Sequence, residues 1–343
     1  MQLTLMPQNQ VFELTAGHPV LDTALAAHVN LPHSCKGGNC GACRARLLAG
    51  EVNYPRGLPL GLTAEERAEG YVLLCQAVPR TDLVVEAREI RPVNEVQIRT
   101  LPCRVARLER LAPDVMALYL RLPVIEDFHF RAGQYLDILL PGGGRRSFSI
   151  ASPPHDAGLL ELHVRQVSGG EFTQQVFDGL AVGALLRIEG PLGQFVYREP
   201  GPERPAGPVI LVAGGTGFAP VKAILRALLE GGERRAVHLY WGARHEVDLY
   251  QREWLAARLA RFPQLQFVPV LSEPVGEEGT RYRSGLVHEA VLQDFPDLSQ
   301  AEVYAAGPPA LIAALREALP TRGLAEDRLY FDAFAYAPKA ARR

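Results

Sequence analysis

Three of the five cysteines in the 343-residue sequence fall within nine positions, and a fourth follows in the same segment. Four residues separate Cys35 from Cys40, and two separate Cys40 from Cys43. Cys75 follows after a further 31 residues, which completes the spacing of thiolates that hold a plant-type [2Fe–2S] cluster. The glycines among them allow the loop to fold around a cluster and direct backbone N–H groups at sulfur. The sequence therefore predicts an iron–sulfur centre with these four cysteines as its metal ligands.

Besides unrelated buried thiols, two other interpretations of these cysteines stay open from the residues alone. A zinc-stabilised binding module would also use thiolates, but zinc sites generally take two separate Cys-x-x-Cys pairs, and this segment contains one pair with a third cysteine upstream. A redox-sensing protein would keep an iron–sulfur cluster as a switch. Neither alternative explains the glycine loop described below. Cys103 lies outside the spacing and is predicted to be an inert thiol in a core.

A second group of candidate residues lies on a predicted strand and at the start of a later helix. Arg146, Phe148 and Ser149 lie on an alternating strand, a pattern that is by itself equally typical of a strand facing a core. Gly170 opens a helix with Thr173 in its first turn, and such a helix start offers backbone N–H groups to an anion. The two motifs together predict an anion-binding site.

Two further polar residues lie on the predicted strand between these motifs. His163 and Arg165 are two positions apart, so their side chains point to the same face of that strand. This face either approaches a bound cofactor or carries an exposed pair of polar side chains.

A third group is a glycine loop that follows an apolar strand at 209–213. The loop is the run Gly214, Gly215, Thr216 and Gly217, with Pro220 near the start of the following helix. A strand, a tight glycine loop and a helix let the backbone approach a pyrophosphate at the helix N-terminus. This is not the usual dinucleotide fingerprint, because proline replaces the last glycine and no acidic residue ends the next strand. A plain glycine turn before a helix is the alternative.

The elements that position the cysteines belong to the first segment of the chain, residues 1–92. Short β-like runs surround a helix expected near residues 20–28, whose apolar residues repeat at three-to-four spacing. Thr63 and Glu66 form a capping box that predicts the start of a second short helix. This segment is therefore predicted to be a small α+β domain.

The other two groups of residues lie in segments of different character. Residues 100–200 are mostly alternating strands separated by turn signals, which predicts an antiparallel β-barrel. Residues 207–343 alternate near-continuous apolar strands with helices, which predicts a doubly wound parallel α/β domain. Stretches rich in proline and charge separate the three segments, so we expect a multidomain protein.

Composition argues against several classes of partner. The 36 lysines and arginines nearly balance the 38 aspartates and glutamates, so the electrostatic case for nucleic acid as main partner is absent. No apolar run approaches the roughly 18 to 20 residues that span a bilayer, and residues 1–10 lack the features of a signal peptide. We therefore expect a cytoplasmic protein that binds neither nucleic acid nor membrane. Its oligomeric state is left open.

The three segments together resemble the ferredoxin–NADP reductase family, preceded by a plant-type ferredoxin domain of the β-grasp type. The family's flavin barrel has Arg-x-Tyr-Ser or Arg-x-Tyr-Thr, which is matched from Arg146 with Phe148 in place of tyrosine, and a later Gly-x-x-Ser or Gly-x-x-Thr, which is matched from Gly170. Relatives fused in other domain orders use FMN, which stays open, but the Gly-x-x-Thr helix start favours FAD. The resemblance then implies that Arg146 and Thr173 lie at the FAD pyrophosphate. Phe148 would stack on the ring system, and Ser149 would lie near the reactive nitrogen.

The last segment resembles the nicotinamide lobe of the same family. Gly-Gly-Thr-Gly-x-x-Pro at 214–220 is the characteristic run of that lobe, and Gly307 and Pro308 follow Ala306, where many relatives have cysteine. The resemblance implies that this loop and this turn bind the dinucleotide. Near the end, Phe334 matches the terminal aromatic residue that covers the flavin, although it could equally pack in the last layer of the sheet.

The charge beside Ser272 bears on which dinucleotide is bound. Glu273 stands where relatives that bind a 2′-phosphate have arginine, and its carboxylate would repel that phosphate and accept hydrogen bonds from ribose hydroxyls. NADH is therefore expected. Arg244 follows the second strand and could reach a phosphate, so NADPH stays open.

Three such sites on one chain predict an oxidoreductase that works as an electron relay. A hydride carries two electrons and an iron–sulfur cluster accepts one, whereas a flavin can take the pair and release it singly. We expect electrons to pass from NADH to FAD to [2Fe–2S] and then to an acceptor protein, a dehydratase or an oxygenase component. The domain order resembles reductase components of bacterial aromatic mono- and dioxygenases and CDP-6-deoxy-glucoseen reductases, and the run 145–152 is most similar to the latter.

Overall fold

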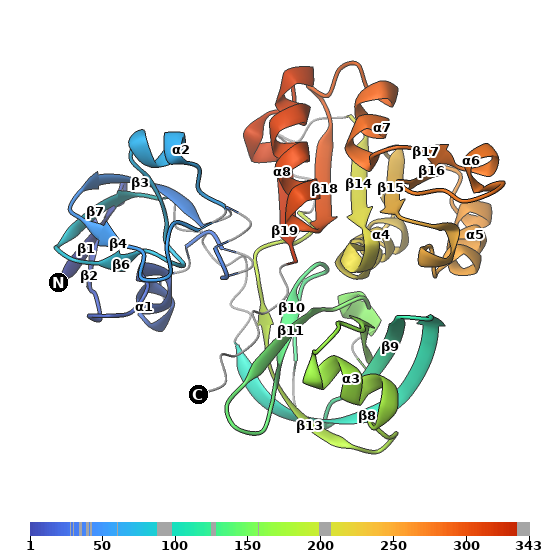
Figure 1. Ribbon diagram of the computed structural model, residues 1–343, viewed down its shortest axis with the longest axis horizontal. Coiled ribbons are helices and arrows are strands. Elements are labelled where there is room, and N and C mark those ends of the chain that lie inside the picture. The colour runs from blue at the N-terminus through green and yellow to red at the C-terminus, as the bar shows by residue number, and fades with distance from the viewer. Residues whose placement is uncertain are drawn as a thin grey trace. The chain divides into compact units, whose positions relative to one another are not determined.

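The computed structural model describes residues 1–27, 29, 31–33, 36–38, 41, 43–59, 61–87, 98–124, 128–156, 158–198 and 207–334. The chain divides into two compact units, one built mainly from the first 95 residues and one from residues 96–331 (Figure 1). Within the described ranges, no helix combines the length and the apolar character that crossing a bilayer requires.

The first unit is a mixed five-stranded sheet with two helices. Its elements are β1 (Gln2–Met6), β2 (Gln10–Glu13), α1 (Val20–Ala26), β3 (Arg44–Ala49), β4 (Val52–Asn53), α2 (Ala64–Ala68), β5 (Tyr71–Leu73), β6 (Val78–Pro79) and β7 (Leu83–Glu86). The sheet order is β2-β1-β7-β3-β5, with β1 parallel to β7 and β4 paired separately with β6. The predicted capping box is present, because Glu66 N–H donates to the Thr63 hydroxyl and Thr63 N–H donates to the Glu66 carboxylate.

Alternation along the strands and helical spacing in α1 build the core of this unit. Leu3 and Leu5 on β1 point to the side on which α1 buries Val20, Leu21 and Ala24. Residues two apart on a strand and three to four apart on a helix thus meet in one apolar cluster, as the sequence periodicity predicts.

The second unit begins with an antiparallel barrel. Its elements are β8 (Arg99–Ala112), β9 (Val115–Arg121), β10 (Tyr135–Leu139), β11 (Arg145–Ser149), the 3₁₀ turn η1 (Pro154–Asp156), β12 (Leu160–Arg165), α3 (Glu171–Asp178) and β13 (Leu185–Leu192). The strand order is β11-β10-β13-β8-β9-β12, and an antiparallel bridge between Ile150 and Leu162 joins the two edges. This bridge closes the sheet, so the predicted barrel is confirmed. Cys103 is buried in its core, where burial raises the pKa of the thiol to about 12.

The rest of the second unit is a six-stranded sheet with helices on both faces. Its elements are β14 (Val209–Gly214), η2 (Gly215–Gly217), α4 (Phe218–Glu230), β15 (Val237–Ala243), η3 (Glu246–Asp248), α5 (Arg252–Arg261), β16 (Leu265–Leu271), α6 (Glu278–Arg281), β17 (Arg283–Ser284), α7 (Val287–Asp294), β18 (Glu302–Gly307), α8 (Pro309–Ala318), η4 (Leu319–Arg322), η5 (Glu326–Arg328) and β19 (Leu329–Ala333). Every residue of β14 and β18 is buried, which explains why both strands are apolar apart from Glu302, which pairs with Arg235.

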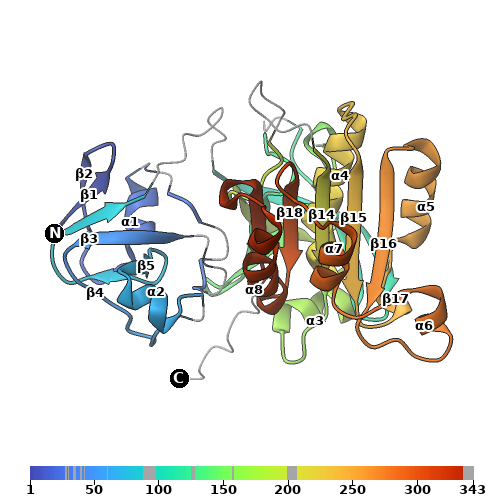
Figure 2. The ribbon, with the colours of Figure 1, turned by 90° about the horizontal axis from the view of Figure 1, so that it is seen from above.

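The order of these strands decides where a ligand can bind. The sheet runs β17-β16-β15-β14-β18-β19, so the chain builds outward from β14 in one direction and then crosses to β18 on the other side. Because crossovers between parallel strands are right-handed, α4 and α5 lie on one face of the sheet and α7 and α8 on the other (Figure 2). The switch between β14 and β18 leaves a crevice outside their carboxyl ends, where open sheets of this kind bind ligands.

Candidate cofactor sites

Two of the four predicted cluster ligands fall within the described residues, and Cys35 and Cys40 lie outside them. Cys43 and Cys75 are both buried in the first unit. The backbone N–H of Cys75 donates a hydrogen bond to the Cys43 sulfur at 3.5 Å. A backbone N–H directed at a cysteine sulfur stabilises a thiolate, and such contacts tune iron–sulfur centres. The two described ligands therefore lie side by side in a setting that fits the predicted cluster.

The loop that carries the first three cysteines is tied to the segment of Cys75. The Gln76 side-chain amide donates to the carbonyl oxygen of Lys36 at 2.9 Å and to that of Cys75 at 2.9 Å. Gly38 has a φ of +79°, and a Cβ on it would lie 2.7 Å from the Gln76 Cγ. Only glycine fits there, because a side chain would be strained and would push the two segments apart.

The predicted flavin strand is β11, at the closed edge of the barrel. Ser149 is buried, whereas Arg146 and Phe148 are half-buried. The Phe148 ring lies 5.7 Å from that of Phe172 in α3, so the two predicted flavin motifs meet in space. Arg145 pairs with Glu189, but Arg146 has no ion pair to any described residue. Of the two adjacent arginines, Arg146 is thus the one whose charge is available to an anion.

The side chain of Thr173 forms hydrogen bonds that close the turn at the start of α3. The Thr173 hydroxyl donates to the carbonyl oxygen of Gly170 at 3.0 Å and accepts from the N–H of Val167 at 3.2 Å. A Cβ on Gly170 would lie 2.6 Å from that hydroxyl oxygen, so glycine is needed for the closure. The structure gives Thr173 a role in shaping this turn, and its predicted contact with a pyrophosphate stays a prediction.

The glycine loop after β14 and the turn after β18 lie against each other. A Cβ on Gly217 would lie 2.0 Å from the carbonyl oxygen of Ala306, and one on Gly214 would lie 2.8 Å from Cδ of Pro308. Gly215 has a φ of +54°. The contact with β18 and its turn therefore requires glycine in this loop. A plain glycine turn before a helix would not need such a contact.

This loop and turn line a cavity of about 400 Å³. Gly214, Gly215 and Pro308 are among its lining residues, together with Ser272 and Arg244 from the ends of β16 and β15. Thr216, Gly217, Pro220 and Gly307 are not in the lining; Gly217 and Pro220 are buried and support the loop from behind. The cavity lies at the strand switch point, so its position fits a dinucleotide.

The barrel contributes Arg165 to the same cavity. Its Nη1 lies 3.1 Å from the position of a Cβ on Gly215. Its Nε and Nη2 are buried and have no hydrogen-bond partner among the described residues, although Asp114 and Asp248 lie 3.2 and 3.9 Å away as ion-pair partners. A guanidinium with unused donors beside a glycine loop fits an anionic group such as a pyrophosphate. His163, on the same face, is fully buried, so the alternative of an exposed pair is wrong.

Trp241 holds the glycine loop from the neighbouring strand. Its indole N–H donates to the carbonyl oxygen of Gly215 at 3.0 Å, and its ring stacks on Phe218 with centroids 3.9 Å apart. Trp241 lies near the end of the strand that, as the sequence showed, does not end in an acidic residue. In the structure, this hydrogen bond and this stacking contact tie the glycine loop to β15.

Glu273 and Phe334 are also not among the residues that line this cavity. Glu273 is exposed and does not line it; its N–H donates to the carbonyl oxygen of Arg244 at 3.0 Å, so an acid and a base stand together at the strand ends. Phe334 follows directly after β19 and is half-buried. The roles of Glu273 in choosing NADH and of Phe334 and Ser149 beside the flavin stay predictions. His288, at the start of α7, lines the cavity and has no signal in the sequence that could have indicated it.

Comparison with known families finds three matches along the chain. Residues 3–80 match the 2Fe-2S iron-sulfur cluster binding domain, residues 102–197 the oxidoreductase FAD-binding domain, and residues 211–317 the oxidoreductase NAD-binding domain. These matches confirm the three predicted cofactors and the fold class. The predicted domain limits at 92, 100, 200 and 207 lie outside the matched ranges and stay predictions.

Similar full-length proteins are found among characterised relatives and solved structures. The CDP-6-deoxy-L-threo-D-glycero-4-hexulose-3-dehydrase reductase of Yersinia pestis is 38% identical over 338 residues, which are 97% of this chain and 98% of the relative. Reductase component 1 of terephthalate 1,2-dioxygenase from a Comamonas species is 34% identical over 337 residues, or 98% of each chain. The crystal structure of the Amycolatopsis reductase GcoB has a TM-score of 0.76 at 35% identity and covers 97% of this chain and 98% of its own. The similarity thus extends over all three domains in the same order.

Proposed function

Because this chain belongs to the family of electron-transfer oxidoreductases that join a [2Fe–2S] domain to FAD-binding and NAD-binding domains, we propose that it oxidises NADH and delivers electrons singly to a separate acceptor protein. The observation that supports this most directly is the cavity that Arg165 of the barrel shares with Gly214 and Gly215 of the glycine loop. A dinucleotide bound there contacts the lobe that carries the flavin motif.

We assign the residues that would hold each group from the sequence motifs together with the geometry of the described residues. Cys35, Cys40, Cys43 and Cys75 would ligate the cluster, β11 and the N-terminus of α3 would hold FAD, and the switch-point cavity would hold the dinucleotide. When bound, the flavin converts a two-electron donor into a source of single electrons for the cluster. No general base among the side chains is needed for that conversion.

The contributions of the chain itself are electrostatic and steric. Arg146 supplies a positive charge without a competing carboxylate among the described residues. Arg165 lies beside Gly215 and pairs with Asp114 and Asp248, but its Nε and Nη2 make no hydrogen bond to a described residue. Ser149 is a buried hydroxyl at the end of the flavin strand. These groups can neutralise pyrophosphates and fix ring orientation, which is how a protein positions a redox cofactor.

The acceptor is the most specific part of the proposal. We propose a dehydratase that acts on a CDP-linked deoxysugar, because the Yersinia pestis relative is named as the reductase of such an enzyme and is 38% identical over nearly the full chain. The alternative is an oxygenase component, which the 34% identity with the terephthalate dioxygenase reductase supports. We also propose a cytoplasmic location.

Anaerobic stopped-flow mixing with NADH tests the relay. We expect the flavin absorbance to bleach first and the cluster absorbance second, with about two irons per chain and FAD as the extracted flavin. The same instrument compares NADPH, for which we expect a lower specificity constant. A cluster that stays oxidised contradicts the electron order, and zinc in place of iron contradicts the whole assignment.

A coupled assay distinguishes the two acceptors. The purified chain is mixed with a CDP-6-deoxy-hexulose dehydrase or with the oxygenase component of a dioxygenase, each with its own substrate, and NADH consumption is followed. We expect substrate-dependent consumption with the dehydrase. Turnover with the oxygenase alone would establish the alternative.

A further inference from the structure

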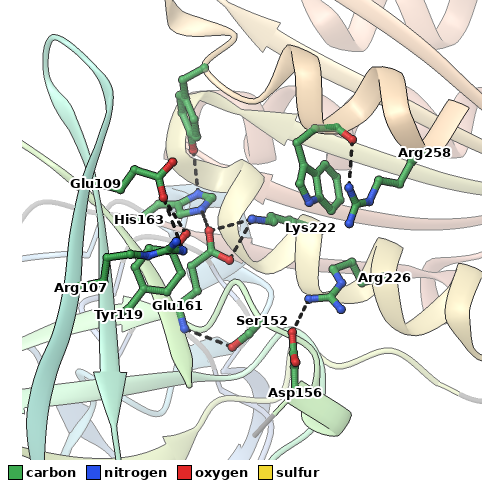
Figure 3. Close-up of polar contacts among 12 residues, drawn as sticks. Arg107, Glu109, Tyr119, Ser152, Asp156, Glu161, His163, Lys222, Arg226 and Arg258 are labelled. Atoms are coloured by element: carbon green, nitrogen blue, oxygen red, sulfur yellow. Dashed lines mark hydrogen bonds and ion pairs between the residues drawn. The ribbon is translucent and has the colours of Figure 1, made fainter. Parts of the chain in front are cut away.

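The second unit buries an ion pair between its barrel and its nicotinamide-binding sheet. The Glu161 carboxylate on β12 accepts two hydrogen bonds from the Lys222 ammonium on α4, at 2.7 and 2.9 Å (Figure 3). The two side chains are 8% and 4% exposed. At this pair, a charge on one lobe therefore meets a charge on the other with little water between them.

A neutral histidine fixes the orientation of this carboxylate. His163 Nε2 lies 2.9 Å from Oε1 of Glu161, and its Nδ1 lies 3.0 Å from the hydroxyl of Tyr250, which precedes α5 in the other lobe. Burial lowers the pKa of His163, so the ring is neutral near pH 7. We assign the tautomer in which Nε2–H donates to Glu161 and Nδ1 accepts from Tyr250. Both ring nitrogens are then used, one within the barrel and one across the interface.

Each residue of the ion pair is connected to a segment that carries one of the candidate cofactor sites. The N–H of Glu161 donates to the Ser152 hydroxyl at 3.1 Å. Ser152 follows three residues after Ser149, the last residue of the flavin strand. On the other side, Lys222 lies in the second turn of α4, the helix that the glycine loop opens. The pair thus connects the flavin strand with the helix that carries the dinucleotide loop.

Stability alone does not account for burying these charges. A buried ion pair is often no more stabilising than two apolar side chains of the same volume, because both charges lose their hydration. Two directed hydrogen bonds do what apolar contact cannot, because they fix the distance and the angle between the groups that they join. Hydride transfer is sensitive to such placement, since reacting atoms must approach to about 3 to 3.5 Å.

We propose that Glu161 and Lys222 are positioning residues that hold the nicotinamide-binding lobe on the flavin barrel in the arrangement from which hydride is transferred. This inference rests on the proposed function, because it assumes that NADH reduces a flavin bound to the barrel. It assigns the pair no contact with either cofactor.

The central test is the double variant E161Q/K222M, compared with the wild-type holoenzyme. It removes both charges together, keeps the side-chain volumes and leaves a carbonyl oxygen to accept from His163, so no charge is left unpaired. We expect the single-turnover rate of flavin reduction by NADH to fall about tenfold or more, because small misplacements of reacting groups have effects of this size. We expect a melting temperature close to that of the wild type and a change of less than about threefold in the NADH Kd, because the cavity residues are untouched.

A spectroscopic readout separates positioning from a merely structural role. Stacking of the nicotinamide on the flavin gives a long-wavelength charge-transfer absorbance, which does not depend on turnover. We expect this absorbance to be lost in E161Q/K222M and in K222M, and to be kept in K222R, which retains the charge. A double variant that keeps both the absorbance and the wild-type rate overturns the inference, as does a K222R variant that behaves like K222M.

The chain provides a matched control on the same helix. Arg226 of α4, one turn after Lys222, pairs with Asp156 of the barrel at 2.7 Å, but Asp156 is 57% exposed. Exposed pairs contribute little, so D156N is expected to change the flavin reduction rate by less than about twofold. If D156N slows flavin reduction as much as the double variant does, the loss of any contact between the lobes is enough to slow it. The inference is then wrong. Failure of NADH to reduce the wild-type flavin would instead reject the proposed function.

Discussion

The starts of α3 and α4 have similar sequences, with a glycine and a threonine within a few residues of the first helical position, but they are built differently. At α3 the Thr173 hydroxyl closes the turn onto Gly170, so the hydroxyl's hydrogen is already used. At α4 the loop is packed against the turn after β18, and its residues line a cavity. Local sequence therefore indicates where a helix can bind an anion, and the neighbouring strand decides how open that site is.

Among substitutions at the two helix starts, that of Gly217 is expected to have the largest effect on stability and on NADH binding. In G217A the new Cβ would lie 2.0 Å from the carbonyl oxygen of Ala306, so the loop and the β18 turn must separate. We expect a loss of about 3 kcal/mol in the free energy of unfolding, as for overpacked sites, and a roughly hundredfold rise in the NADH Kd. Thermal unfolding and NADH titration measure the two effects.

The matched control is Gly158 in the barrel, where a Cβ would meet no atom within 4 Å. G158A is expected to match the wild type in both measurements. Normal NADH binding by G217A would show that the loop is less constrained than its contacts indicate, and the contrast between the two helix starts would disappear.

Removal of the indole N–H of Trp241 is expected to have an intermediate effect on NADH binding. W241F keeps an aromatic ring on Phe218 but loses the hydrogen bond to the carbonyl oxygen of Gly215. A single hydrogen bond contributes about 1 kcal/mol, so we expect a roughly fivefold rise in the NADH Kd with the FAD content unchanged. An unchanged NADH Kd, measured by titration, would mean that Phe218 and the β18 turn fix the loop without help from the indole.

The smallest effect on ligand binding is expected at Thr173. T173A removes the hydrogen bonds to Gly170 and from Val167, which should lower the free energy of unfolding by about 1 kcal/mol, as loss of a helix cap does. Because the hydroxyl is engaged in the turn, the FAD Kd should change less than about twofold; fluorescence titration of the apoprotein measures it. A tenfold weaker FAD affinity would show that the Thr173 hydroxyl itself, and not only the backbone N–H groups at the start of α3, contacts the flavin pyrophosphate.

Several features of the fold and sites were predictable because they depend on residues close in sequence. The capping box of Thr63 and Glu66 spans three positions, and the glycine loop follows its strand directly. The shared face of His163 and Arg165 follows from alternation along one strand. Glu161 lies on the same face of β12 as His163 and Arg165, but nothing in the sequence showed that another lobe would cover this face.

The sequence by itself determined the three kinds of site, since cysteine spacing, glycine loops and strand periodicity are set within a few residues of one another. Tertiary structure alone decided which side chains meet from distant positions: Lys222 with Glu161, and Arg165 with Gly215. The physical reason is that such contacts depend on strand register, barrel closure and the packing of one lobe on another. Each of these is a sum over many weak interactions that no short stretch of sequence contains.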